Sequence, residues 1–271
     1  MSPLHADFTL IGVAHLLPLP AGPNGSSGFV AVRARALHDA QVLADAGFDG
    51  IILENFGDAP FPAGPVDAHV IALVAMLAAD IKARHALAVG INLLRNDAHA
   101  AMGVAAASGA DFIRVNIHAG AMVTDQGLLQ GDAHRTLRYR RELGVADPGP
   151  GHVRIAADVL VKHAVPLGNV EIGAVAADTA RRGGAEILIV TGEGTGKAAD
   201  PARVRRVREV VPDVPVWLGS GVTVETLPLW MAIAQGAIVG TAVHEDSDVT
   251  KPLDAARAAA IVAAARAAGR T

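Results

Sequence analysis

The 271-residue chain contains no cysteine. Disulfide bonds, thiolate metal sites and a cysteine nucleophile are therefore excluded. The absence is compatible with a reducing compartment, and we expect a cytoplasmic protein. Aromatic residues make up only 3% of the chain. Aliphatic side chains must therefore supply most of the core packing.

Long runs of one charge and long apolar runs are also missing, and the formal net charge is −4. The apolar stretch near Leu10 contains His15 and ends at Pro18, unlike a signal peptide. No run approaches the roughly 18 apolar residues of a membrane span, so we expect none. Two arginine clusters lie in segments with helical periodicity. We interpret each as a solvated helix face and expect no nucleic-acid partner. The clusters comprise Arg135, Arg138, Arg140 and Arg141, and Arg203, Arg205, Arg206 and Arg208.

Hydrophobic residues make up 51% of the chain and charged residues 18%, enough to bury a large core. One unit recurs: a β-branched run, a polar or glycine-rich turn, and an Ala-rich amphipathic stretch. Alternating strands and helices indicate a parallel sheet. Eight uninterrupted units predict one α/β domain over residues 1–271, a (β/α)₈ TIM barrel, with an open doubly wound sheet as the alternative. Strands are predicted at 8–14, 50–55, 87–93, 112–118, 153–161, 186–191, 214–220 and 237–241, and helices near 30–46, 65–85, 97–108, 131–144, 171–182, 200–210, 223–234 and 252–268.

Polar residues cluster near the carboxyl ends of the predicted strands, which is the end that carries the active site in barrel enzymes. On the fourth strand, alternation turns Arg114, Asn116 and His118 toward the barrel axis. Arg114 then needs a carboxylate partner, because an unpaired buried charge is costly. Six further polar residues sit at similar depth on other strands: His15, Glu54, Asn92, Asp158, Thr191 and Ser220.

Asp158 is the first candidate for acid/base chemistry, because an apolar setting can move a carboxyl pKa toward neutrality. Its change to Asn is expected to abolish turnover while sparing the fold. Lys162 and His163 follow on the next loop, where the lysine serves as an electrophile or contacts an anion. The alternatives remain open: Arg114 with Glu54 or Asp158 forms a purely structural ion pair, and the asparagines only bond loop backbone.

Three glycine-rich segments end strands. Gly219–Thr223 and Val239–Thr241 follow the seventh and eighth strands, whose loops offer backbone N–H groups to phosphate in many barrels. We expect Ser220, Gly221, Gly240 and Thr241 to bind phosphate, and tight turns alone are the alternative. The segment 191–198, TGEGTGKA, has the wrong glycine spacing for a P-loop and lacks Ser or Thr after its lysine. It is interpreted as a mobile loop closing over the ligand, with Gly194 and Gly196 as further phosphate contacts.

Long motifs identify the chain as similar to the BtpA family, also called the photosystem I biogenesis or BtpA/SgcQ family. They include VAHLLPLP, DGIILENFGDAPF, GINLLRNDAHAA, ADFIRVNIHAGAMVTDQGLLQGDA, ADVLVKHAVPL, LIVTGEGTG and WLGSGVT. The resemblance implies a ribulose-phosphate-binding-like barrel. It also carries a name from photosystem I accumulation, although members occur in organisms without photosynthesis. The chain departs from the family pattern at its VAH opening, where Met-Val-His is typical, and at Ala242–Val243–His244, where a lysine is common.

By motif, the matching positions are Glu54, Asn55, Asp58, Asn92, Arg95, Asn96, Arg114, Asn116, Thr124, Asp125, Gln126, Asp158, Lys162 and His163. Asp158, His118, Glu54 and Lys162 are the catalytic candidates. The candidates for contacts with the rest of the ligand are His15, Asn55, Asn92, Arg114, Asn116, Asp125, His163 and Thr191.

Three functions are compatible with these residues. The first is an isomerase or lyase that acts on a small phosphorylated sugar or nucleoside-derived metabolite. The second is a non-catalytic assembly factor, for which no docking segment stands out in the sequence. The third is a metal-dependent hydrolase using Glu54, His118, Asp125 and Asp158, although HxH and HExxH spacings are absent. No cofactor is predicted, while Mg²⁺ bridged to phosphate needs only one or two carboxylates. Ala-rich outer helices are compatible with a homo-oligomer.

Overall fold

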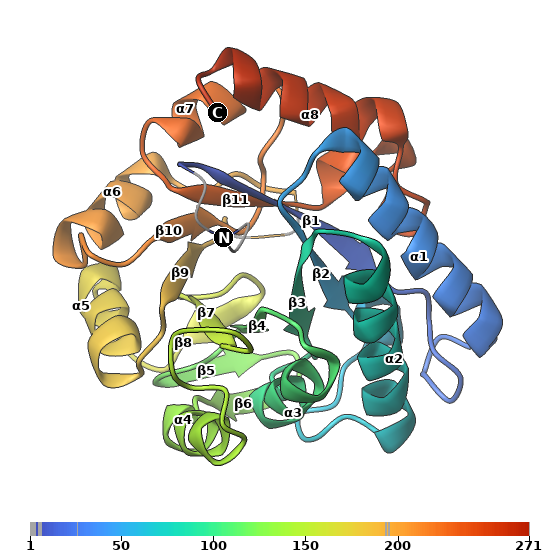
Figure 1. The fold of residues 1–271 in the computed structure, drawn as a ribbon. Helices are drawn as coiled ribbons and strands as arrows, with labels where there is room; N and C mark the ends of the chain where they lie inside the picture. Colours follow the sequence, from blue (N-terminus) through green and yellow to red (C-terminus); the bar gives the residue numbers. More distant parts are fainter. Residues whose placement is uncertain (1–3, 5–6, 26, 193, 195, 271) are drawn as a thin grey trace.

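The computed structural model describes residues 4, 7–25, 27–192, 194 and 196–270. Eight parallel strands close into a barrel in the order β1-β11-β10-β9-β7-β4-β3-β2, which confirms the predicted TIM barrel (Figure 1). Each predicted strand position holds a strand, usually shorter than expected. The barrel strands are β1 (Thr9–His15), β2 (Gly50–Glu54), β3 (Ala88–Asn92), β4 (Phe112–Val115), β7 (Arg154–Asp158), β9 (Ile187–Val190), β10 (Val216–Leu218) and β11 (Gly236–Val239).

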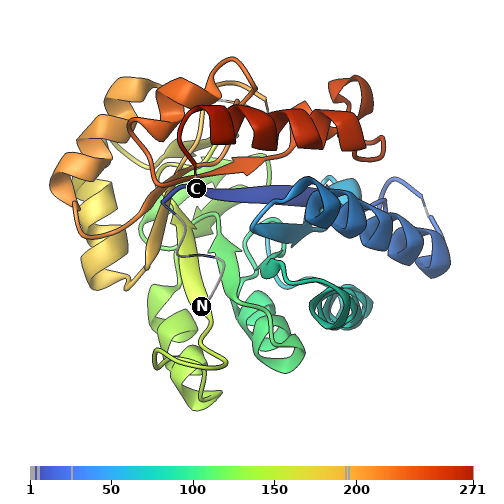
Figure 2. The same ribbon diagram turned by 45° about the horizontal axis from the view of Figure 1, so that its top comes forward.

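Helices form the outer ring, and α8 packs beside α1, so the two ends of the chain complete the ring (Figure 2). Aspartates cap several of these helices, as Asp97 and Asp254 do by accepting backbone N–H groups of the first turn. The helices are α1 (Phe29–Ala46), α2 (Ala68–Arg84), α3 (Ala98–Ser108), α4 (Ala133–Glu142), α5 (Ile172–Ala177), α6 (Pro201–Val210), α7 (Leu227–Met231) and α8 (Ala255–Ala267), and a π-helical turn, η3 (Asp178–Arg182), continues α5.

Apolar side chains fill the middle of the barrel. Phe112 and Trp217 meet edge to face there, with ring centroids 5.8 Å apart. Gly90 makes room for Phe112, because a Cβ at residue 90 would lie 2.2 Å from its ring. Ile52, Ile189 and other aliphatic side chains of this interior cluster complete the packing. The middle of the interior is thus a packed apolar core, above which the polar side chains of the mouth lie.

A three-stranded antiparallel sheet, ordered β6-β5-β8, lies on the loops after β4 and β7 and was not predicted. Its strands are β5 (Ala121–Thr124), β6 (Gly127–Gln130) and β8 (Ala164–Pro166). Met122 and Leu129 of its inner face bury Ile117 and Val161. Because the chain leaves the barrel after Val115 to build this sheet, the inward alternation of β4 ends sooner than the sequence suggested.

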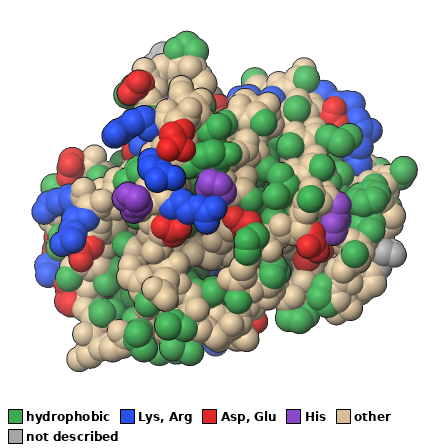
Figure 3. All heavy atoms as spheres, turned by 90° about the horizontal axis from the view of Figure 1, so that it is seen from below, with side chains coloured by type: hydrophobic (Ala, Val, Ile, Leu, Met, Phe, Trp, Pro, Cys, Tyr) green, Lys and Arg blue, Asp and Glu red, His purple; other side chains and the backbone are tan. Residues whose placement is uncertain are grey.

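The outer surface agrees with the interpretation of the arginine clusters as solvated helix faces. Arg138 of α4 is exposed and pairs with Glu142 across 3.2 Å. On the face shown in Figure 3, basic and acidic side chains lie interspersed. Among the helices in the described ranges, none has both the length and the apolarity that a bilayer crossing demands.

Candidate functional site

A buried polar network occupies the top of the barrel, at the carboxyl ends of β2, β3, β4 and β7. Arg114 donates from Nε and Nη2 to the two carboxylate oxygens of Asp158 at 3.0 and 3.1 Å, and its Nη1 lies 3.7 Å from Glu54 Oε2. Asn92 Nδ2 donates to Glu54 at 2.7 Å, and Asn116 Nδ2 donates to Asp158 at 3.0 Å. The structure therefore brings together five of the side chains that strand alternation placed at the mouth.

Asp158 is the acceptor at the centre of this network. Its carboxylate is buried and accepts three hydrogen bonds, two from Arg114 and one from Asn116. Burial lowers the pKa of Arg114, but the Asp158 and Glu54 carboxylates outweigh that effect and raise it. Arg114 thus stays charged and ties two carboxylates together, which favours the structural ion pair considered above.

A second buried pair joins β1 to the loop after β11. His15 Nδ1 lies 2.8 Å from His244 Nε2, and His244 Nδ1 lies 2.7 Å from the Lys251 carbonyl oxygen. A carbonyl only accepts, so His244 carries its proton on Nδ1 and offers Nε2 as an acceptor, and His15 donates from Nδ1. Burial lowers the pKa of His15 well below its usual value, and His244, Lys162 and Arg114 add to that effect. His15 is therefore neutral, with an unprotonated Nε2.

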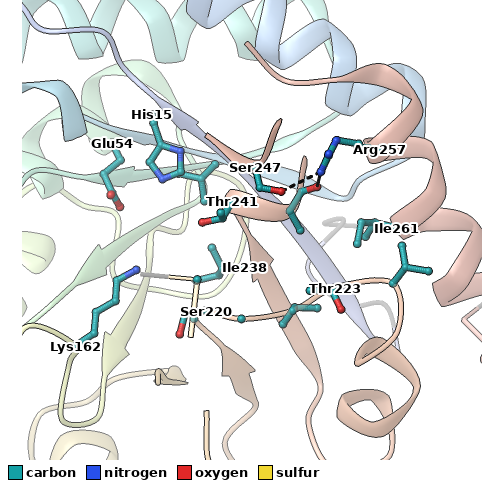
Figure 4. A pocket seen from close by; sticks show the side chains of 18 of the residues that line it. His15, Glu54, Lys162, Ser220, Thr223, Ile238, Thr241, Ser247, Arg257 and Ile261 are labelled. Atoms are coloured by element: carbon teal, nitrogen blue, oxygen red, sulfur yellow. Dashed lines mark hydrogen bonds between the residues drawn. The ribbon is translucent and has the colours of Figure 1, made fainter. Parts of the chain in front are cut away.

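A cavity of about 440 Å³ opens beside His15, and we call it the glycine-loop cavity. Residues 219–225 after β10 and residues 240–242 after β11 form one side of it. In Figure 4, Arg257 of α8 lies at one end, where it donates to Ser247 Oγ at 3.0 Å. Lys162, Glu54 and His15 lie at the other end (Figure 4). The cavity thus joins the predicted phosphate loops to the polar network.

Ser220 and Gly221 line this cavity, and both also hold the segment after β9. Ser220 Oγ accepts from Gly192 N at 2.9 Å and donates to the Lys197 carbonyl at 2.8 Å. Gly221 has a φ of +71°, and a Cβ there would lie 2.3 Å from Ala198 Cα. The Ser220 hydroxyl therefore already makes two hydrogen bonds, and its proton is used within the protein.

Two further glycines predicted to contact phosphate, Gly194 and Gly196, lie in the segment after β9 but in different surroundings. Gly196 lines the glycine-loop cavity, whereas Gly194 lies nearer His163, and a Cβ at residue 194 would stand 3.8 Å from that ring. Two residues of the expected mobile loop, Glu193 and Thr195, lie outside the described residues. Thr191 Oγ1 accepts from Lys162 N at 3.0 Å, so Thr191 positions the lysine backbone.

A second cavity, of about 450 Å³, shares Glu54, Arg114 and Lys162 with the first, and we call it the Arg95 cavity. Its other lining residues include Phe56, Phe61, Leu94, Arg95, Asn116, Asp125 and His163. Burial lowers the pKa of Lys162, and the nearby Arg114 charge lowers it further. Asn55, which was predicted to contact the ligand, holds the loop after β3 instead, because its Oδ1 accepts a hydrogen bond from Leu94 N at 2.7 Å.

His118 is the one catalytic candidate that the structure removes from the mouth. Its Nε2 lies 2.7 Å from the Gly183 carbonyl, at the end of η3 in the outer layer. The cause is the early end of β4, after which the chain turns into β5. The residues proposed for a metal-dependent hydrolase therefore do not converge, since Asp158 binds Arg114 and Asp125 lies exposed at a hairpin tip. Within the described ranges, no three His, Asp or Glu side chains gather as metal ligands would.

Two residues of the site were missed at the sequence level: Arg257, which lines the glycine-loop cavity, and His244, which lies behind His15. Arg257 lies in the first turn of α8. In the sequence, an arginine that enters a cavity from this position looks the same as one that points to solvent. His244 was noticed only as a departure from the family lysine, and nothing in its spacing indicated that it meets His15.

The model of the BtpA family matches residues 6–267. The chain is 40% identical over 255 residues to the photosystem I biogenesis protein BtpA of Synechocystis, covering 94% of this chain and 87% of that protein. It is 40% identical over 257 residues to an uncharacterized protein of Thermococcus kodakarensis, covering 95% of each. The putative sgc region protein SgcQ of Escherichia coli is 29% identical over 256 residues, covering 93% of this chain and 91% of that protein.

Solved barrels show the same fold at low sequence identity. The N-(5'-phosphoribosyl)anthranilate isomerase of Pyrococcus furiosus aligns with a TM-score of 0.57 at 11% identity, covering 96% of this chain and 99% of that one. The (S)-3-O-geranylgeranylglyceryl phosphate synthase of Thermoplasma acidophilum aligns with a TM-score of 0.56 at 16% identity, covering 98% and 96%. At such identities the likeness concerns the fold alone.

Proposed function

The chain belongs to the BtpA family, and from this premise we propose that it is an enzyme, an isomerase or lyase acting on a small phosphorylated sugar or nucleoside-derived metabolite. The metabolite binds in the glycine-loop cavity, with its phosphate at the turns after β10 and β11 and its reacting carbons toward Lys162. Two solved barrels of the same fold are named for compounds that carry phosphate, which is compatible with this proposal.

The observation that carries the proposal is a set of unpaired backbone amides in that cavity. Within the described part of the chain, the N–H groups of Gly221 and Val222 make no hydrogen bond, and Thr241 and Ala242 open the 3₁₀ turn η4 (Thr241–Val243); all four residues line the cavity. Unpaired amides in a concave turn attract anions. Arg257 adds a full positive charge beside them.

His15, Glu54 and Lys162 form the reacting end. In this mechanism His15 Nε2 accepts a proton from a carbon next to a carbonyl group, because His244 keeps the base in the required tautomer. Lys162 Nζ stabilises the negative charge that develops on the carbonyl oxygen. In an isomerase the proton then returns to a neighbouring atom. In a lyase it stays on His15 while the enolate re-forms the carbonyl group and expels the substituent on the next carbon, which leaves with the bonding electron pair. Asp158, first considered for this step, holds Arg114 instead.

Binding of phosphorylated compounds tests this function. In a thermal-unfolding screen of inorganic phosphate, sugar phosphates and nucleotides, a ligand at a hundred times its Kd stabilises the fold by about 2.7 kcal/mol. Arg257→Gln should weaken binding of every phosphorylated hit about tenfold or more, because it removes a charge-assisted contact. Arg205→Gln, on the exposed face of α6, is the matched control and should leave binding unchanged. The absence of stabilisation by any phosphorylated compound would contradict the proposal.

A non-catalytic assembly role, as in the name of the Synechocystis relative, is the second candidate, and one surface favours it. The outer face of the β6-β5-β8 sheet exposes Val123, Leu128 and Val165 by 46%, 51% and 67%, and Val123 pairs with both of the others. Contiguous exposed apolar side chains are typical of docking surfaces. Under this function, Val165→Asp would abolish association with a stoichiometric partner, and the Arg257 variant would not.

A further inference from the structure

Arg95 is a buried cation without an ion pair. Its side chain is 6% exposed, and its Nη2 donates to the Lys162 carbonyl at 2.9 Å. Its Nε is buried with no hydrogen-bond partner. No carboxylate of the described residues lies within 4.0 Å of its guanidinium. A buried charge without an ion pair is costly, because the carboxylates that act on Arg95 from further away replace only part of its lost hydration.

The carboxylates around the Arg95 cavity are committed elsewhere or exposed. Asp158 is bound by Arg114 and Asn116, and Glu54 accepts from Asn92 and lies against Arg114. Asp125 is exposed at the β5–β6 turn and accepts from Gln126 at 2.6 Å. Lys162 lines the same cavity and also lacks an ion pair within the described ranges. Arg95 and Lys162 therefore present two cations without an ion pair to one space, and Asp158 and Glu54 act on both only from a longer distance.

The walls of the cavity complete a subsite for more than a small ion. Phe56, Phe61 and Leu94 supply apolar surface. Asn116 Oδ1 is buried without a partner, so it is ready to accept from a hydroxyl or amine group. At about 450 Å³ the cavity accommodates several heavy atoms besides the anion.

We propose that Arg95 and Lys162 form a second anion subsite and that the substrate is a phosphorylated compound with a further anionic group, a carboxylate or a second phosphate. This inference rests on the proposed function, since the phosphate occupies the glycine-loop cavity. The two cavities share Glu54, Arg114 and Lys162, so one small molecule spans both. Its reacting carbons then lie between the two anions, beside Lys162.

Matched pairs of ligands test the second subsite. Glucose 6-phosphate and 6-phosphogluconate differ mainly by a carboxylate, as do glycerol 3-phosphate and 3-phosphoglycerate. Fructose 6-phosphate and fructose 1,6-bisphosphate differ by a phosphate. Calorimetric titration should show that the more anionic member of at least one pair binds about tenfold more tightly or better. A preference within the carboxylate pairs identifies the second anion as a carboxylate, and a preference within the phosphate pair identifies it as a phosphate.

Variants assign the preference to its residue. Arg95→Met should abolish the preference and leave the Kd of the less anionic member unchanged, whereas Arg95→Lys should keep part of it. Arg257→Gln should weaken both members of a pair equally, because it acts at the phosphate end. Equal binding within every pair, or an undiminished preference in Arg95→Met, would overturn this inference alone. Failure of every probe to bind would overturn the proposed function as well. If Arg95→Met does not fold, the wild-type pairs and Arg95→Lys decide the question.

Discussion

His15 and His244 form a directional hydrogen-bonded pair, with Nδ1 of His15 2.8 Å from Nε2 of His244. The direction is set from outside the cavity, because the Lys251 carbonyl accepts from His244 Nδ1 at 2.7 Å. His15 stands at the end of β1 next to Glu54 of β2, its register partner, so the pair faces the polar network. The Lys251 carbonyl, through His244, thereby determines which ring nitrogen of His15 carries the proton.

We therefore predict that His15 carries its proton on Nδ1 in the free protein. Nitrogen chemical shifts of the imidazole, measured on labelled protein at pH 7.5, distinguish the two tautomers. His244→Phe removes the acceptor and should shift His15 toward a mixture or toward the Nε2–H form. It should also cost about 1–3 kcal/mol of stability, because a buried N–H loses its partner. A wild-type His15 found with its proton on Nε2 would rule out the assigned direction.

The pKa shifts of buried histidines predict how stability depends on pH. Burial lowers the pKa of His15, and burial and Arg140 lower the pKa of His118. Both rings are neutral in the folded protein, and in the unfolded chain they take up protons as the pH falls below about 6.5. Their stabilisation is present above that pH and is lost below it, by up to about 1.4 kcal/mol per pH unit for each ring.

Urea unfolding at pH 7.5, 6.5 and 5.5 measures this effect. His118→Gln should flatten the profile without touching the mouth, because the ring lies in the outer layer. His134→Gln, on the exposed side of α4, should leave the profile as in the wild type. A His118→Gln protein with the wild-type pH dependence would refute the role of this ring.

The sequence predicted the barrel because each strand–helix unit repeats the same local pattern, and the closed sheet follows from eight such units. Alternation likewise located Arg114 and Asn116 on the inner face of β4. Alternation failed two residues later, at His118, which does not face the barrel axis. The chain has left the barrel at this point to form β5, which pairs with β8 about 40 residues further along the chain. That pairing is a long-range contact with no local periodicity. The family motif named Arg95, but its burial without an ion pair is a property of packing that only coordinates show, as is the place of Arg257 beside the cavity.

The Arg114–Asp158 pair changes one expectation from the sequence. Asp158→Asn leaves Arg114 buried with a weakened partner, and breaking such a pair costs about 3–5 kcal/mol. We therefore predict a large loss in the urea midpoint together with lost ligand binding, rather than a variant that spares the fold. Asp178→Asn in the exposed pair with Arg182 is the control, and it should change stability by less than about 1 kcal/mol. Wild-type stability in Asp158→Asn would show that the pair contributes little to the fold.

The barrel interior offers a test that is independent of function. A Cβ on Gly90 would lie 2.2 Å from Cζ of Phe112, whose ring is fully buried against Trp217. Gly90→Ala should therefore destabilise the protein by about 1–3 kcal/mol through overpacking, even though alanine suits a strand at least as well as glycine.

Phe112→Leu alone should also be destabilising, because it leaves a cavity beside Trp217. Combined, the two changes relieve each other, since the shorter leucine vacates the space that the new methyl group needs. Urea unfolding of the four proteins in this cycle should give a double variant more stable than the sum of the single effects predicts, by about 0.5 kcal/mol or more. Strictly additive losses would mean that Gly90 is not required by the Phe112 ring.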